Sequence, residues 1–212
     1  MAEHPANKLF GFHCCPDPAI GEPVDDFRKN GVRGLMTDHG LEFIKTYVRD
    51  NDVIRGSLES DNTTWHLAFL EAMYQRPGCA VCWLGKWPLK ARVFLLLGRG
   101  SKILLYNGSE SLDREKDEFD MYMIPEAILK AKIEDKSIGR CEMRLEDGGV
   151  LAYDGRMAYD LVKGSLFVFG FVPEEISDKF AKGREKLVLP QSLKDKADEL
   201  STSRTKFIFR LV

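Results

Sequence analysis

The spacing of apolar residues divides the chain into a helical part and a strand-rich part. Over residues 35–78, apolar side chains recur every three or four positions, which is the period of an amphipathic helix. A helix is expected from an N-cap at Thr37 or Asp38 to about Asp50. A second helix is expected from Asn62 to Arg76. It is apolar on most of its circumference and should therefore be buried.

From Cys79 onward, short apolar runs alternate with turn residues, as they do in strands. Strands are expected at residues 79–83, 92–97, 103–106, 141–145, 150–153, 165–172 and 206–212. Three further helices are expected to open at Pro125, Pro173 and Pro190, because proline is favoured at the first helical position. The last of these would bury three apolar residues, Leu193, Ala197 and Leu200.

These elements predict one domain over residues 1–212, of the α+β class. The expected architecture is a β-rich sandwich or distorted jelly roll, with the N-terminal helices packed on one face. Residues 1–34 hold four of the nine prolines and are expected to form an extended arm. The helical part then covers residues 35–78, and the β-rich part covers residues 79–212.

Composition and the N-terminal sequence predict where the protein is located in the cell and which partners it does not bind. The formal net charge is only -2, with 30% charged residues, so no nucleic-acid or membrane partner is predicted. The N-terminus lacks the basic and apolar regions of a secretion signal, and the apolar runs are too short to span a bilayer. The five cysteines are an odd number and are expected to be reduced thiols. A cytoplasmic location is therefore predicted, and the oligomeric state is left open.

Cysteine and histidine residues raise the question of a metal site. Cys79 and Cys82 form a C-x-x-C motif, and the run His13-Cys14-Cys15 would add zinc ligands if the two segments met in space. The C-x-x-C motif lies in an apolar run, where thiols behave as small hydrophobic groups. No metal and no other cofactor are therefore predicted.

Polar residues that are costly to bury stand in or beside the strands expected over residues 91–172. If several of them share one face of a sheet, they form a pocket for a small ligand. The candidate ligand-binding residues are Arg92, Tyr106, Arg144, Tyr153, Arg156 and Tyr159. An antiparallel strand pair would bring Arg144 and Arg156 together around an anion. The alternative is that these residues face outward from an amphipathic sheet.

Asp154 and His66 are the candidate acid–base residues. Glu71 lies five positions after His66, about 140° around the expected helix, and cannot readily orient the imidazole. A histidine with a purely structural role is the alternative for His66.

Three segments resemble the middle and later part of phytanoyl-CoA-dioxygenase-like proteins. Residues 91–97 followed by 101–109 are similar to a strand pair that ends in a Gly-Ser turn, and residues 146–156 look like a later strand entered through an acidic-glycine turn. The resemblance implies a double-stranded β-helix. That family binds iron through a His-x-Asp/Glu pair and a distal histidine, a facial triad. This chain has no such pair, and Met157-Ala158-Tyr159 stand where the distal histidine would be expected.

Three functions are consistent with these patterns. The first is metal-independent binding of a small, anionic organic metabolite in a β-barrel pocket. The second is a cofactor-independent isomerase, cyclase or lyase that acts on a metabolite by acid–base catalysis. The third is a protein-interaction module that uses the charged stretch Glu110–Asp120 and the proline-bearing arm.

Overall fold

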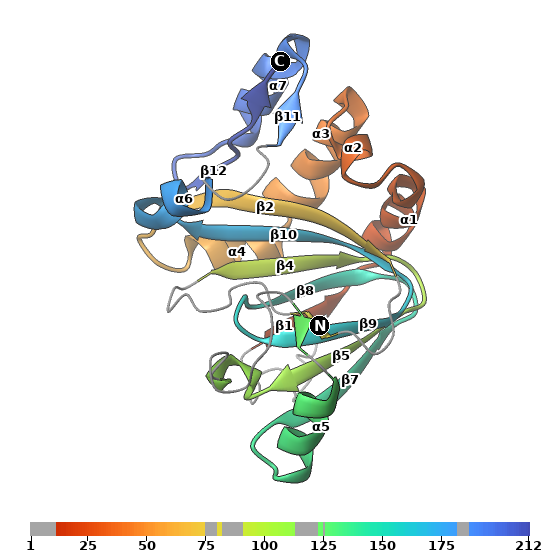
Figure 1. Ribbon diagram of the computed structural model, residues 1–212. Helices are drawn as coiled ribbons and strands as arrows, with labels where there is room; N and C mark the ends of the chain where they lie inside the picture. The colour runs from red at the N-terminus through yellow and green to blue at the C-terminus, as the bar shows by residue number, and fades with distance from the viewer. Residues whose placement is uncertain (1–11, 75–79, 82–90, 113–122, 125, 182–186) are drawn as a thin grey trace.

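The structure is a computed structural model that describes residues 12–74, 80–81, 91–112, 123–124, 126–181 and 187–212 (Figure 1). Its main feature is a pair of facing β-sheets. The first sheet has six strands in the order β1 (Phe12–Pro16), β8 (Gly149–Asp154), β4 (Arg92–Leu97), β10 (Ser165–Pro173), β2 (Trp65–Tyr74) and β12 (Thr205–Lys206). Its neighbours are antiparallel, except that β12 runs parallel to β2.

The second sheet has five strands, and its paired neighbours are antiparallel. Their order is β6 (Met123–Ile124), β3 (Ala80–Val81), β9 (Ala158–Lys163), β5 (Ser101–Asn107) and β7 (Gly139–Leu145). A small parallel pair, β11 (Val188–Leu189) and β13 (Arg210–Leu211), lies near the end of the chain. The expected strands at 92–97, 103–106, 141–145, 150–153 and 165–172 are confirmed within one or two residues at most of their ends.

The inward faces of the two large sheets enclose an apolar core. Alternate residues of β4, β8 and β10 contact alternate residues of β5 and β9 there, as strand geometry requires. The buried residues of this core include Phe69, Val93, Leu95, Leu105, Leu151, Tyr153, Tyr159, Leu161 and Val168. The molecule is therefore an α+β protein built on a β-sandwich, as the sequence predicted.

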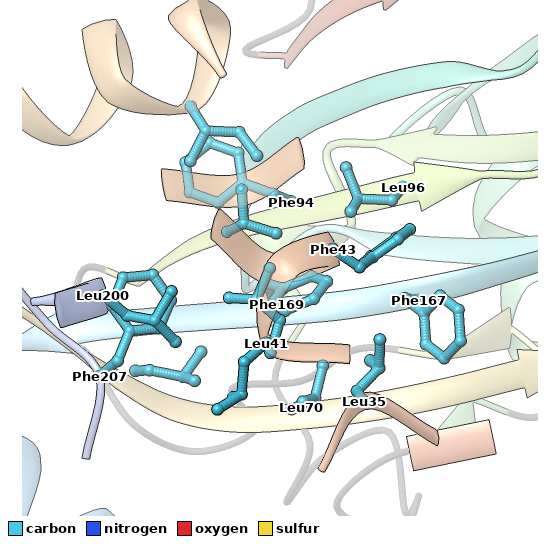
Figure 2. Close-up of a cluster of buried hydrophobic side chains, with 14 of the residues drawn as sticks. Leu35, Leu41, Phe43, Leu70, Phe94, Leu96, Phe167, Phe169, Leu200 and Phe207 are labelled. Atoms are coloured by element: carbon cyan, nitrogen blue, oxygen red, sulfur yellow. The ribbon is translucent and has the colours of Figure 1, made fainter. Parts of the chain in front are cut away.

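The helices of the first sixty residues cover the outer face of the six-stranded sheet. They are α1 (Pro18–Phe27), α2 (Gly31–Leu35), α3 (Asp38–Ile44) with a wider turn over Lys45–Arg49, and α4 (Asp52–Glu59). Helix α7 (Lys194–Leu200) adds to them, as the predicted helix after Pro190. Figure 2 shows this second core, in which Phe43 meets Phe167 with ring centroids 5.9 Å apart. Thr37 caps α3 as predicted, since its side chain accepts a hydrogen bond from Gly40 N.

Two helices lie elsewhere. Helix α5 (Glu126–Glu134) packs on the outer face of the five-stranded sheet through Leu129, and α6 (Glu174–Ala181) contacts β2 and β10. Their starts agree with the helices predicted at Pro125 and Pro173, although Pro125 itself lies outside the described residues. Short 3-10 turns occupy Arg28–Asn30, Ser109–Ser111 and Gln191–Leu193.

Three of the predicted elements are wrong. The single strand expected at 206–212 is two short strands, β12 and β13, which belong to different sheets. The predicted helix Asn62–Arg76 is strand β2, which is buried between the helices on one face and the sandwich core on the other. A strand covered on both faces is apolar at consecutive positions, so it does not show the alternation that distinguishes a strand. The expected extended arm 1–34 contains strand β1 and helices α1 and α2 within its described residues.

The two ends of the sandwich differ. At one end, here called the hairpin end, short turns centred on Arg99, Asp147 and Gly164 connect strands of one sheet to strands of the other (Figure 1). Gly148 has a φ of +90°, and a Cβ there would lie 2.4 Å from the Gly21 Cα, so this turn requires glycine. The opposite end, here called the rim, is where β2 and β4 begin and where β8 and β10 end.

Candidate functional site

The rim carries seven of the eight residues that the sequence singled out as a site. They are His66, Arg92, Tyr106, Tyr153, Asp154, Arg156 and Tyr159, each within two or three positions of a strand end at the rim. Arg144 is the exception, because it pairs with Lys102 near the hairpin end. Seven of the eight residues therefore gather at one end of the sandwich, whereas the sequence led us to expect them on one face of a sheet.

The seven rim residues do not share one face. Tyr153 and Tyr159 point into the sandwich, where their ring centroids lie 5.7 Å apart in an edge-on arrangement. Tyr106 lies on the outer face of the five-stranded sheet, in the cluster that contains Leu129 of α5. Because these faces are separated by a sheet, the candidate ligand-binding residues do not all line one pocket.

Arg92 belongs to the helix-covered face of the six-stranded sheet. Its guanidinium carbon lies 4.4 Å from the centroid of the Trp65 ring, and its Nη2 donates to Asp61 Oδ2 at 2.8 Å. Burial lowers the pKa of Arg92, and the charge of Asp61 opposes that effect. The pKa of Asp61 is lowered, first by the backbone N–H of Thr63. The guanidinium of Arg92 is thus held by Trp65 and Asp61, two residues of the protein itself.

Arg156 and Asp154 form a local pair in the turn after β8. Asp154 Oδ1 accepts from Arg156 N at 3.0 Å and from its Nε at 2.9 Å, while Oδ2 accepts from Nη2 at 2.8 Å. The expected meeting of Arg144 and Arg156 does not occur. Strands β7 and β8 follow one another in sequence but belong to different sheets, so they do not form the antiparallel pair that was predicted.

His66 is a buried polar residue at the rim. Its neighbours on β2, Trp65 and Leu67, face the helices, so the imidazole points to the opposite, inward side. It is 9% exposed, and among the described residues neither ring nitrogen has a hydrogen-bond partner. Nε2 lies 3.7 Å from Glu174 Oε1, close enough for an ion pair if the ring is protonated but too long for a hydrogen bond.

Glu174 is a site residue that sequence reasoning missed. It begins helix α6 directly after β10, and β10 pairs with β2 so that Val172 lies opposite His66. The only local signal was an acid after Pro173, which was interpreted as helix-start chemistry. The sequence excluded Glu71 as a partner of His66, and the carboxylate that does lie near the ring comes from a distant part of the sequence.

The cysteines behave as thiols in the described part of the chain. Cys14, Cys15 and Cys141 are thiols and not disulfides, and Cys14 packs against the sandwich core. Burial, followed by the neighbouring Cys15 and Cys141, raises the pKa of Cys14 to about 12. Cys79 and Cys82 lie outside the described residues.

The family resemblance implies an iron site, which needs two histidines and one carboxylate grouped around the metal. Tyr159 stands on β9 near the position expected for the distal histidine and points into the sandwich. Within the described ranges, no three His, Cys, Asp or Glu side chains are grouped so that they could hold a metal. These residues therefore do not fit a facial triad. None of the described helices is long and apolar enough to cross a membrane.

Comparison with known proteins gives no family and only distant structural likeness. No family model and no curated protein sequence matches the chain. Apo HygX from Streptomyces hygroscopicus is similar at a TM-score of 0.48 and 11% identity, over 82% of this chain and 88% of that one. The WlaRB TDP-quinovose 3,4-ketoisomerase from Campylobacter jejuni has a TM-score of 0.25 and 11% identity, over 54% and 75%. EvdMO1 has a TM-score of 0.27 and 15% identity, over 49% and 25%. At these TM-scores, the likenesses decide neither topology nor function.

Proposed function

We propose that this chain is a jelly-roll protein of the double-stranded β-helix type that binds a small organic molecule at its rim without a metal. The strand order supports the topology. One sheet carries the order β2-β10-β4-β8 and the other β3-β9-β5-β7. Hairpins at the hairpin end carry the chain from one sheet to the other, which is the two-layer arrangement of a jelly roll.

The observation that carries the binding proposal is the state of His66. A buried polar group without a hydrogen-bond partner costs about 1–3 kcal/mol. Val172 lies opposite His66 on the paired strand β10, and Val172 belongs to a small apolar cluster with Ala68, Ala91 and Ile176, so the buried ring stands beside apolar side chains on one side and Glu174 on another. A ligand that hydrogen-bonds to the ring would remove the cost, and this combination is typical of small-molecule sites.

The chemistry of the ligand follows from the donors near the rim. A neutral imidazole offers one N–H, and a protonated one offers two and a positive charge. A carboxylate or carbonyl oxygen would satisfy either form, and an anionic ligand would favour the protonated ring. Arg92 and Arg156 already hold the carboxylates of Asp61 and Asp154, so His66 is the central residue of this proposal.

A second candidate function is favoured by the carboxylate of Glu174. At 3.7 Å from His66 Nε2, it would stabilise the imidazolium formed when His66 takes a proton from a substrate. The same ring would return the proton to another atom of that substrate, which completes an isomerisation without a cofactor. Asp154, the other candidate acid–base residue, would in this proposal hold the β8–β9 turn through Arg156.

The test uses the protein purified from its natural host. Native mass spectrometry identifies any small molecule that copurifies, and calorimetry measures its rebinding to His66→Leu and to His13→Leu, a control on the exposed His13 of β1. We expect binding to be lost in the first variant and kept in the second. Unchanged affinity in His66→Leu would contradict the proposal. Proton exchange of the ligand in D₂O, abolished by His66→Leu, would distinguish the enzyme from the binding protein.

The protein-interaction alternative stays a prediction. Most of the stretch Glu110–Asp120 and residues 1–11 of the arm lie outside the described residues.

A further inference from the structure

Strand β7 forms an edge of the five-stranded sheet. It pairs with β5 on one side, and on its other side it has no strand partner in the described part of the chain. Cys141 and Met143 face the sandwich core, whereas Arg140, Glu142 and Arg144 are exposed on the outer face. This edge therefore combines backbone groups available for a further strand with alternating charged side chains.

The charges on this face are mostly positive. Arg144 lies opposite Lys102 on β5, and Lys102 lies opposite Lys163 on β9, so three cations stand side by side on adjacent strands. Glu142 bridges two of them, with Oε2 at 2.8 Å from Lys102 Nζ and Oε1 at 2.9 Å from Arg144 Nη2. Within the described residues, Arg140 and Lys163 have no ion-pair partner. Here Arg140, Arg144, Lys102 and Lys163 are called the cationic face.

This arrangement decides which strands can add to the edge. Like charges directly opposite one another on paired strands are destabilising. If β7 paired antiparallel with the β7 of a second copy about Glu142, Arg140 would lie opposite Arg144 and each Glu142 opposite its counterpart. An acidic strand would instead place carboxylates beside the cations. Charged residues on an edge strand commonly prevent a protein from associating with itself. Here the positive charges disfavour a second copy of β7 but not an acidic strand.

We propose that the β7 edge binds an extended acidic segment of a partner protein, which adds to the sheet as a further strand. Backbone hydrogen bonds to β7 would supply affinity, and acidic side chains on the cationic face would supply selectivity, as in other cases of strand addition. The site lies on the outer surface of the sheet opposite the one that carries His66, so it does not depend on the proposed binding of a small molecule.

The experiment uses the full chain and a synthetic probe, the eight-residue peptide Val-Glu-Val-Gln-Val-Glu-Val-Thr with both ends blocked, whose two glutamates can lie opposite Arg140 and Arg144 while the glutamine lies opposite Glu142. Amide shifts in NMR spectra should change along residues 139–145, and the affinity should fall as salt rises from about 0.05 to 0.5 M. The double variant R140E/R144E should bind at least about tenfold more weakly. The matched control is R210E, which replaces an exposed arginine on β13 and should bind the peptide as the wild type does. Circular dichroism melting checks that each variant is folded.

A second probe separates strand addition from attraction between charges. The same peptide, N-methylated at alternate residues on one edge, keeps its carboxylates but cannot donate backbone hydrogen bonds from that edge. We prepare both possible methylation registers, and at least one should bind about tenfold more weakly. The proposal would be overturned if both methylated peptides bound as tightly as the unmethylated one, if inorganic tripolyphosphate competed as well as the peptide does, or if the affinity were unchanged in R140E/R144E.

Discussion

The aromatic ring of Phe69 lies against the backbone of Gly170, its direct neighbour on the paired strand. A Cβ atom at Gly170 would come within 1.9 Å of Phe69 Cζ, closer than any real contact. Because Gly170 has no side chain, the ring of Phe69 can lie over this position of β10 and enter the sandwich core. The ladder between β2 and β10 is irregular at the next residue, where the register shifts between Gly170 and Phe171.

Gly170→Ala is expected to destabilise the protein by about 1–3 kcal/mol through overpacking. The cost should fall when Phe69 is replaced by leucine, because the atoms that collide with the new methyl group are then gone. Urea unfolding of both single variants and of the double variant gives the coupling energy. An equal cost of Gly170→Ala in both backgrounds would show that the backbone, and not the ring, excludes alanine.

Arg92→Ala is expected to lower the free energy of unfolding by about 1–3 kcal/mol. The substitution removes the contact over Trp65, worth about 0.5–2 kcal/mol, and leaves Asp61 without its cation. Arg55→Ala, which removes an exposed pair with Asp52, is the control and should cost less than about 0.5 kcal/mol. If Arg92 served only a ligand, its replacement would leave the unfolding midpoint near that of the control and abolish binding.

Asp154→Ala should lower the melting temperature more than Arg156→Ala does. Asp154 accepts from both the side chain and the backbone N–H of Arg156, whereas removing the arginine side chain leaves the backbone bond in place. Both groups are partly exposed, so we expect Arg156→Ala to cost less than about 1 kcal/mol. Calorimetric melting of the two variants measures the order, and the reverse order would assign the stabilising role to the guanidinium.

His66→Leu is expected to leave the stability unchanged or to raise it by up to about 1.5 kcal/mol. The imidazole is buried and has no hydrogen bond to any residue that the structure describes, so an apolar side chain of similar size removes a cost. Residues kept for function often reduce stability in this way. Urea unfolding measures the difference. A loss above about 1 kcal/mol would instead indicate that His66 stabilises the fold.

Cys14 should make stability fall at high pH. Its pKa in the folded protein is raised to about 12 from an ordinary value of 9.0, so the folded state holds the proton more tightly than the unfolded state. The contribution is fully present below pH 9 and is lost as the pH rises from there toward 12. Urea midpoints at pH 8 and pH 10.5, compared with those of Cys14→Ala, isolate this effect. A variant with the same pH dependence as the wild type would exclude Cys14 as its source.

The strands that the sequence predicted are those whose apolar runs are short and bounded by turn residues. Strands β4 and β10 are almost wholly apolar because both of their faces are covered, and Gly98 and Gly164 mark their ends. Strand β2 has the same surroundings but is rich in leucine, alanine and methionine, which favour helices. Its apolar residues were therefore fitted to a helical period. Strand β9 was missed because Tyr159 and Asp160 interrupt its apolar run.

Most of the residues singled out from the sequence lie at the rim, but the sequence predicted a pocket on one sheet face and did not predict their arrangement. Arginines and tyrosines at strand ends are visible locally, and topology happened to bring most of those ends together. Which face each side chain occupies depends on how strands alternate between the two sheets, which no local pattern records. The contact between His66 and Glu174 depends on the pairing of β2 with β10.

That pairing also has a consequence for the order in which the molecule folds. The ladder between residues 65–74 and 165–173 contains nine paired positions. Its two strands are far apart in the chain, because strands β3 to β9 lie between them in sequence. Contacts between segments so distant in sequence form slowly, because the chain must first lose the entropy of closing a long loop. During synthesis, β2 and the helices that cover it must wait for β10 to leave the ribosome. Until then, β2 lacks this strand partner, and an apolar strand with an unpaired edge is the kind of segment that aggregates or binds a chaperone.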